Sequence, residues 1–245
     1  MIQASLMKLC ILLTIFPITI GDSNHNQWTV RLHYESSSNA VVCGGVLISP
    51  KHILTAKHCV IDALTQGTPL THIEFTNVDH LKGQPFRTTY VHDHYDLDLS
   101  ILVLEQPVEI QPIQLSKSKK LDGGKVEFHG FGQGVYKEVK LTLESRQDCN
   151  TEVAEYFQTE YNELFDHLCS RGHIVPGDSG GPLMKRTNKK QWKLVGIASF
   201  AIKKQFEDLP APHPDWYKKE EIIGYFVNLR FAMTWIQNII ENKFG

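Results

Sequence analysis

One short stretch of the chain, residues 176–183 (PGDSGGPL), combines a serine with the small residues that a nucleophile loop needs. A serine hydroxyl is a weak nucleophile at neutral pH, so it needs a general base and N–H donors that hold the developing oxyanion. The backbone N–H groups of Gly177 and Ser179 could be those donors, because glycine tolerates such a turn and adds no side chain. A glycine-rich turn between two strands has the same composition, so the rest of the chain must decide.

Two further stretches run from apolar strand patterns into polar residues. Residues 41–49 (VVCGGVLIS) precede residues 53–59 (ILTAKHC), and the polar loop 92–98 (HDHYDLD) runs into the apolar residues 99–104. The histidines and aspartates of the polar loop have an alternative use as metal ligands, because His-x-His is a usable ligand spacing. That spacing also fits loops in general, and no further ligand cluster follows in the sequence, so we expect no metal and no cofactor.

These stretches and their order resemble the chymotrypsin-like serine peptidases, from about Trp28 to the end of the chain. The shared motifs are Cys-Gly-Gly, Leu-Thr-Ala-x-His-Cys, Asp-Leu-Ser-Ile-Leu and Gly-Asp-Ser-Gly-Gly-Pro. The resemblance implies a catalytic triad and an oxyanion site: His58 as general base, Asp98 as the acid that orients it, Ser179 as nucleophile, and the N–H groups of Gly177 and Ser179 as oxyanion donors.

The resemblance selects Asp98 over Asp93 and Asp96, because the family's acid is followed at once by a buried strand. A neutral His58 would have to accept the serine proton, so activity should rise with pH through the ionisation range of an ordinary imidazole, about pH 6.5. Lys57 departs from the small residue usual in the family. A cation beside His58 would disfavour the imidazolium that forms during catalysis, if the two side chains approached each other.

The fold implied by the resemblance is all-β: two packed six-stranded antiparallel β-barrels with a C-terminal helix. We expect one peptidase domain over residues 22–245, with barrel 1 at about 22–112 and barrel 2 at about 123–245, joined by the linker-like stretch 107–124. The helix has an apolar stripe. Its members are Phe231, Trp235, Ile236, Ile239 and Ile240.

Four cysteines remain if the amino-terminal segment is removed, and an even number fits an oxidising compartment. Four cysteines allow three sets of pairs, and the resemblance implies Cys43–Cys59 and Cys149–Cys169. Between the second pair lie apolar residues at helical spacing, which we interpret as core contacts of a helix rather than a ligand groove. They are Val153, Phe157, Tyr161, Leu164, Phe165 and Leu168.

Residues 1–21 have the pattern of a secretory signal peptide, with Lys8 ahead of an apolar run and a small residue, Gly21, before Asp22. The apolar run is too short to span a bilayer. We therefore expect a secreted, extracellular protein with no membrane segment after removal of the signal. The sequence leaves open whether the chain starts at Met1 or at Met7.

Net charge is −2 at pH 7, and neither a basic stripe nor a long acidic tail is present. This distribution argues against nucleic acid as a partner. We expect a protein or peptide substrate, a protein protease inhibitor as a further candidate partner, and a monomeric chain.

The primary pocket, by an ungapped count from Ser179, has His173 at its base, where trypsin-like members have an aspartate. The resemblance assigns further substrate contacts to Ser199, Phe200, Ala201 and Gly224. Without a carboxylate, the pocket should not favour Arg or Lys; His173 would favour acidic or polar side chains when protonated and aromatic ones when neutral. The alternative is that His173 caps a collapsed pocket.

In the family, a cut after a basic residue frees an amino terminus that pairs with the aspartate preceding the nucleophile, here Asp178. No Lys or Arg lies between Lys8 and Arg31, so we expect no such cleavage. Another cation would then have to pair with Asp178, with His129 and Lys185 as candidates, or the secreted protein is a weak enzyme.

Together these features predict a secreted serine endopeptidase that hydrolyses peptide bonds through an acyl-enzyme. The alternative is a catalytically weak or silent homologue that keeps the barrels and acts as a binding or regulatory module.

Overall fold

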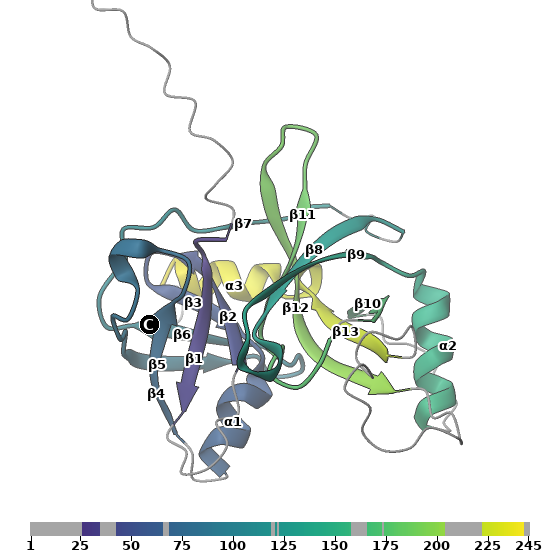
Figure 1. Cartoon of the computed structure of the whole chain (residues 1–245), viewed down its shortest axis with the longest axis horizontal. Coiled ribbons are helices and arrows are strands. Elements are labelled where there is room, and N and C mark those ends of the chain that lie inside the picture. Colours follow the sequence, from purple (N-terminus) through teal and green to yellow (C-terminus); the bar gives the residue numbers. More distant parts are fainter. Residues whose placement is uncertain are drawn as a thin grey trace, which may run out of the picture.

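The computed structural model describes residues 26–34, 43–65, 69–118, 121, 123–157, 166–172, 174–203 and 222–242. The expected signal peptide, its cleavage site and His173 lie outside the described residues. Two curled sheets form the two halves of the molecule, and the strands of the first half precede those of the second along the chain (Figure 1).

The first sheet has six antiparallel strands in the order β4-β1-β2-β3-β6-β5. They are β1 (Thr29–Tyr34), β2 (Cys43–Ser49), β3 (His52–Thr55), β4 (Leu70–Phe75), β5 (Thr88–Asp93) and β6 (Ser100–Leu104). Phe86, just before β5, exchanges two backbone hydrogen bonds of 2.8 and 2.9 Å with Ile73 of β4. Because this pair joins the two ends of the strand order, the sheet closes on itself.

The second sheet has the antiparallel order β10-β13-β12-β11-β8-β9, and the short strand β7 pairs in parallel with β12. The strands are β7 (Gln114–Leu115), β8 (Lys125–Gly130), β9 (Lys137–Thr142), β10 (His167–Arg171), β11 (Pro182–Arg186), β12 (Trp192–Lys203) and β13 (Ile222–Asn228). Glu144, after β9, donates its N–H to the carbonyl of Cys169 in β10 over 2.9 Å. The expected architecture of two six-stranded antiparallel barrels with a C-terminal helix is therefore confirmed.

The helices are α1 (Lys57–Thr65), α2 (Arg146–Phe157) and α3 (Met233–Ile240), with short 3-10 turns η1 (Asp79–Leu81), η2 (Gly132–Gly134) and η4 (Leu229–Phe231). Ser145 caps α2 by accepting the N–H of Asp148 over 3.1 Å. Within the described residues, no helix is long and apolar enough to cross a membrane.

The helix expected between Cys149 and Cys169 is only partly correct. Val153 is buried, as expected for a core contact, but Phe157 ends α2 with its ring exposed. Leu168 is in strand β10, where the pairing with β13 places it opposite Phe226. Tertiary strand pairing thus overrides the helical spacing at this end, and residues 158–165 lie outside the described residues.

The core of the first half extends beneath α3, which returns from the second half to pack there (Figure 1). Ile236 and Ile239 are buried in the same cluster as the strand residues Leu47 and Ile101. Each such side chain contributes about 1.5–3 kcal/mol when fully buried. The packing of α3 therefore fastens the first half to the chain that follows the second sheet.

The two halves meet at the loop that carries Ser179. Gly44 of β2 donates its N–H to the carbonyl of Ser179 over 2.7 Å. Gly180 has φ +79°, and a Cβ there would lie 2.2 Å from the Gly44 carbonyl oxygen and 2.3 Å from Thr55 Oγ1. Only glycine fits this close approach, so the loop sequence and the packing of the halves depend on each other.

Candidate active site

His58 and Asp98 are held together by two hydrogen bonds. His58 Nδ1 lies 2.8 Å from Asp98 Oδ2, and the backbone N–H of His58 donates to Asp98 Oδ1 over 2.9 Å. His58 is in the first turn of α1, where backbone N–H groups lack partners within the helix and a carboxylate is favourable. Asp98 therefore aligns both the helix start and the imidazole ring.

Asp98 also accepts a hydrogen bond of 2.6 Å from Ser199 Oγ. Burial by itself raises the pKa of Asp98, but the hydrogen bonds and charge of His58, together with the bond from Ser199, outweigh it and lower the pKa to about 2. Asp98 is thus a carboxylate at neutral pH. It can hold the imidazole in the tautomer with a proton on Nδ1, which leaves Nε2 to act as a base.

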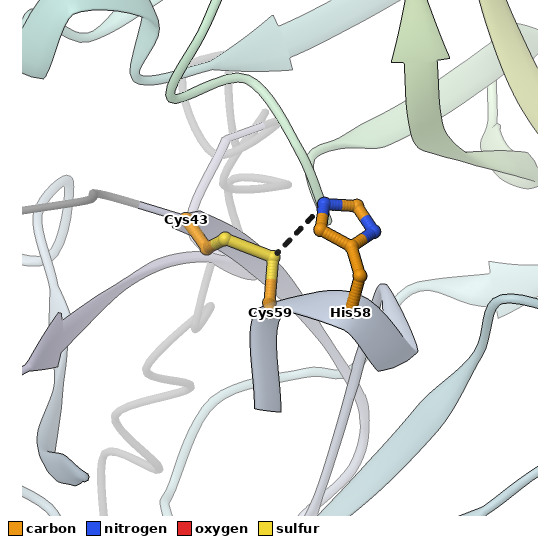
Figure 2. A group of neighbouring side chains, drawn as sticks. All are labelled: Cys43, His58 and Cys59. Atoms are coloured by element: carbon orange, nitrogen blue, oxygen red, sulfur yellow. Dashed lines mark hydrogen bonds between the residues drawn. A yellow bond between two sulfur atoms is a disulfide. The ribbon is translucent and has the colours of Figure 1, made fainter. Parts of the chain in front are cut away.

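The backbone beside His58 is fixed by the disulfide between Cys43 and Cys59, which spans 16 residues. Figure 2 shows the bridge next to the imidazole, with Cys59 Sγ 3.9 Å from His58 Nε2. A loop of this length contributes about 3 kcal/mol in the chain-entropy account. Cys43, His58 and Cys59 lie close enough together to suggest a metal site. Because both cysteines are in the disulfide, neither has a thiolate to bind a metal ion. The structure also has the disulfide between Cys149 and Cys169.

The other ionisable groups of the 92–98 loop face elsewhere. Asp93 accepts a hydrogen bond from Ser100, and the Nδ1 atom of His94 accepts N–H bonds from residues 96 and 97 over 3.2 and 3.0 Å. Lys57 Nζ donates to the carbonyl of His94 over 2.8 Å. The lysine thus points at this loop, which gives its ammonium a partner other than the His58 imidazole.

Ser179 lies on the wall of a cavity of about 260 Å³. The preceding turn is tight: Gly177 has φ +97°, and the N–H of Asp178 donates to the carbonyl of Val175 over 3.0 Å. A Cβ at Gly177 would be 2.8 Å from the Phe131 carbonyl oxygen. A glycine is therefore required for this turn, as expected for a residue that presents its N–H to a reacting group.

Apolar side chains supply most of the cavity wall, and Lys203 is the one ionisable residue among its described members. The lining consists of Ile174, Val175, Pro176, Ser179, Ala198, Ser199, Phe200, Ala201, Ile202, Lys203 and Ile222. Three of the four described residues expected to contact substrate, Ser199, Phe200 and Ala201, are in this set. Ser199 directs its hydroxyl to Asp98 rather than into the cavity.

Gly224 does not open the pocket in the way that its small size suggests. A Cβ on Gly224 would lie only 2.2 Å from Ile174 Cγ1, so the Ile174 side chain already fills the space above the glycine. Phe200 stacks on Tyr225, with ring centroids 4.7 Å apart and planes inclined by 4°. Ile174, Lys203 and Ile222 are lining residues that the motif comparison missed, because no motif includes them.

Asp178 directly precedes Ser179 in the sequence. Its carboxylate has a partner that the sequence did not reveal. Lys137 Nζ lies 2.5 Å from Asp178 Oδ2. The two expected candidates are wrong: His129 bonds to Glu127 and Tyr136, and Lys185 Nζ lies 3.2 Å from the Cβ position of Gly124 at the other end of β8.

The family model named Trypsin matches residues 19–213, which include both halves of the site. The chain therefore belongs to the trypsin family.

Curated relatives are similar over most of this chain. Phenoloxidase-activating enzyme 1 of Spodoptera litura is 28% identical, covering 92% of this chain and 66% of its own length, and CLIP domain-containing serine protease B9 of Anopheles gambiae is 27% identical, covering 90% and 62%. Mouse chymotrypsin-C is 26% identical, covering 79% of this chain and 83% of its own length. This chain thus spans roughly three fifths to two thirds of the two arthropod relatives.

A solved structure supports the fold. The scabies mite inactivated protease paralogue S-I1 superposes with a TM-score of 0.64 at 22% identity, covering 90% of this chain and 97% of that one. At this identity the likeness concerns the fold alone.

Proposed function

We propose that this protein is a serine endopeptidase in which His58, Asp98 and Ser179 form the catalytic triad. The observation that carries the proposal is the set of three hydrogen bonds on Asp98, two from His58 and one from Ser199, beside the cavity that contains Ser179. A partly buried carboxylate that is ionised and hydrogen-bonded to an imidazole is the arrangement that turns histidine into an effective base. Membership of the trypsin family supports the same assignment.

The reaction follows from these positions. His58 takes the proton of Ser179 as the serine oxygen attacks the peptide carbonyl, and the N–H groups of Gly177 and Ser179 stabilise the oxyanion. His58 then gives the proton to the leaving amine, and an acyl-enzyme forms on Ser179. Water activated by His58 releases the acyl group and restores the serine.

The cavity supports an apolar side chain at the residue before the cleaved bond. Its described lining has no Asp or Glu, and its one ionisable residue is the basic Lys203. A buried Arg or Lys of the substrate would therefore lack a counter-ion, which costs several kcal/mol. Ile174 occupies the space above Gly224, which favours medium-sized aliphatic side chains over the largest aromatic ones.

The proposal extends to location and partners. A signal-like amino terminus and two disulfides support secretion to an oxidising environment. Protein substrates fit the family, whose relatives here include a proclotting enzyme of Tachypleus tridentatus. We propose that the chain acts as a monomer and is open to protein protease inhibitors.

A fluorophosphonate probe tests the chemistry directly. We expect the wild-type protein to be labelled, and the Ser179→Ala and His58→Ala variants not to be labelled. Circular dichroism on each variant establishes that the fold is retained. A folded wild-type protein that is not labelled would instead support the silent homologue, a binding or regulatory module.

A peptide library tests the pocket. We expect cleavage after Leu, Met and other apolar residues, with Arg and Lys among the poorest. Ile174→Ala should shift the preference toward Phe and Tyr by about tenfold, because removing two or more methylene-sized groups is worth 1–3 kcal/mol in such a pocket. Cleavage mainly after Arg or Lys would show that the pocket has been interpreted wrongly.

A further inference from the structure

The carboxylate of Asp178 is enclosed by the backbone of two glycines, Gly130 and Gly132. Its side chain is 0% exposed. A Cβ added at Gly130 would lie 2.3 Å from Asp178 Oδ1, and one at Gly132 would lie 2.9 Å from the same atom. The absence of side chains at these two glycines thus makes the space that the carboxylate fills.

Compensation for the buried charge comes from few groups. Lys137 Nζ contacts Asp178 Oδ2 at 2.5 Å, and the N–H of Val175 donates to the same oxygen over 2.8 Å. Among the described residues, Oδ1 has no partner that meets the distance and angle of a full hydrogen bond, although the backbone of Gly132 lies close and also favours the ionised carboxylate. Since an unpaired buried carboxylate is strongly unfavourable, the inward position of Asp178 depends chiefly on Lys137.

The register of the second sheet directs Lys137 to this place. Lys137 of β9 pairs with Gly130 of β8, the glycine that leaves room for the carboxylate. Its neighbour Glu138 accepts a 2.9 Å hydrogen bond from Tyr136, which also contacts the buried His129 at 3.1 Å. Because side chains alternate along a strand, these contacts on one face hold Lys137 toward the other.

The position of the Asp178 carboxylate also fixes the conformation of the backbone turn that contains Gly177. Asp178 and Val175 bond to each other twice, through the Asp178 N–H and through its carboxylate, so the turn between them is closed on both sides. The carbonyl of Pro176 accepts the N–H of Gln133 over 3.0 Å. If the carboxylate moved out to water, the Val175 bond would be lost and the Gly177 N–H would lose its fixed direction.

We propose that Lys137 is a positioning residue that holds the turn 175–178, and with it the Gly177 N–H, in the direction needed to bind the oxyanion. Lys137 would do this in the intact chain, so that no amino terminus released by cleavage is needed to pair with Asp178. The inference rests on the proposed peptidase function. Lys137 Nζ already occupies the position beside Asp178 Oδ2, so any other amine would have to displace it. Lys137 touches neither substrate nor the reacting atoms, and it acts through Asp178 and Gly177.

The test compares Lys137→Met with Lys140→Met in the full-length secreted protein. Lys140 is on the same strand and is exposed, which makes it the matched control. We expect Lys137→Met to slow fluorophosphonate labelling and to lower kcat by about 100-fold, the usual effect of losing one oxyanion donor, with KM changed less. Lys140→Met should stay within about twofold of wild type, and Lys137→Arg should retain a substantial part of the activity because the cation remains.

Two further variants separate positioning from simple folding support. If Lys137→Met does not fold, Lys137→Gln keeps a donor without the charge and carries the same expected loss. An added Gly-Ser dipeptide at the mature amino terminus should leave labelling unchanged. Loss of labelling with this extension would show that a free amino terminus is needed and would overturn the proposal.

A measurement that needs no catalysis keeps the two proposals distinguishable. Hydrogen exchange of the Gly177 amide, followed by NMR, should be at least about tenfold faster in Lys137→Met and unchanged in Lys140→Met. If the wild type is not labelled, the peptidase proposal fails, while the Gly177 amide still decides on Lys137. Labelling within threefold of wild type in Lys137→Met, with unchanged Gly177 exchange, would refute the inference.

Discussion

Two carboxylates near the candidate nucleophile, the partly buried Asp98 and the fully buried Asp178, are stabilised in different ways. Asp98, from the first half, accepts hydrogen bonds from the backbone and ring of His58 and from Ser199. Asp178, from the second half, is stabilised by Lys137 and the Val175 amide, with a smaller contribution from the backbone of Gly132. Loss of a single partner should therefore be tolerated better at Asp98 than at Asp178.

The acidities of the two groups differ accordingly. Burial opposes ionisation at both sites, but at Asp98 the hydrogen bonds outweigh it and the pKa falls to about 2. At Asp178 burial raises the pKa, and Lys137 together with the backbone of Val175 and Gly132 counteracts this only in part. The number of donors around each carboxylate therefore decides whether it stays ionised despite the cost of burial.

The largest effect should come from breaking the more stable site. Asp98→Asn keeps the shape but favours the wrong imidazole tautomer, so we expect kcat/KM to fall by about 10⁴-fold. The control is Asp96→Asn, an exposed change in the same loop that should leave kcat/KM within about twofold. Kinetics with a peptide substrate measure both, and a loss under tenfold for Asp98→Asn would remove Asp98 from the triad.

Breaking the Asp178 site should act on stability as well. Lys137→Met leaves a buried carboxylate without its cation, and we expect the free energy of unfolding to fall by about 3–5 kcal/mol. Adding Asp178→Asn to that variant should recover part of the loss, because the uncompensated charge is gone. Urea unfolding of the two single variants and the double variant gives the coupling energy. Additive losses would show that the two side chains do not interact.

The pH dependence of stability should have opposite signs at the two sites. The lowered pKa of Asp98 stabilises the fold above its ordinary value of 3.8, and this contribution, about 2 kcal/mol, should be lost as pH falls toward 2. The raised pKa of Asp178 means that the folded state holds its proton more tightly, so stability should fall as pH rises above 3.8 through the folded value.

Unfolding curves of wild type, Asp98→Asn and Asp178→Asn between pH 2 and pH 7 measure these contributions by difference. The advantage of wild type over Asp98→Asn should shrink as pH falls. Its advantage over Asp178→Asn should shrink as pH rises. Parallel curves for the two variants would mean that the sites are electrostatically alike.

The smallest effect should come from removing one of several donors. Ser199→Ala takes one hydrogen bond from Asp98 and leaves the two from His58, so we expect roughly 1 kcal/mol of lost stability and a fall in kcat/KM of no more than about tenfold. Ser118→Ala, an exposed change, is the control. A loss as large as that of Asp98→Asn would show that Asp98 depends on one donor, as Asp178 does.

The strands and the candidate triad could be predicted from the sequence because their determinants are local. His58 lies between an apolar strand and a cysteine, Asp98 directly precedes a buried strand, and Ser179 is surrounded by glycines that a tight turn requires. The two-barrel fold was implied by the family resemblance that these motifs carry, and the strand order confirms it. Each of these features can be recognised within about ten consecutive residues.

The helix between the second pair of cysteines was predicted less well. Apolar residues at helical spacing continue to Leu168, but that residue belongs to β10 because its neighbours pair with β13. A strand whose partner is far away in the sequence has no local signal strong enough to overrule a helical period. The same limit applies to Ile174, which covers Gly224 from a loop that no motif includes.

The sequence alone determined which residue types stand at the candidate triad positions and which cysteines were available to pair. Only the tertiary structure decided which cation reaches Asp178. His129 is one residue from Gly130 in β8, and a shift of one residue along a strand turns the side chain to the opposite face, away from Asp178. Lys137 reaches the carboxylate because the pairing of β8 with β9 places it opposite that glycine, and the register of two strands is set by packing across the whole sheet.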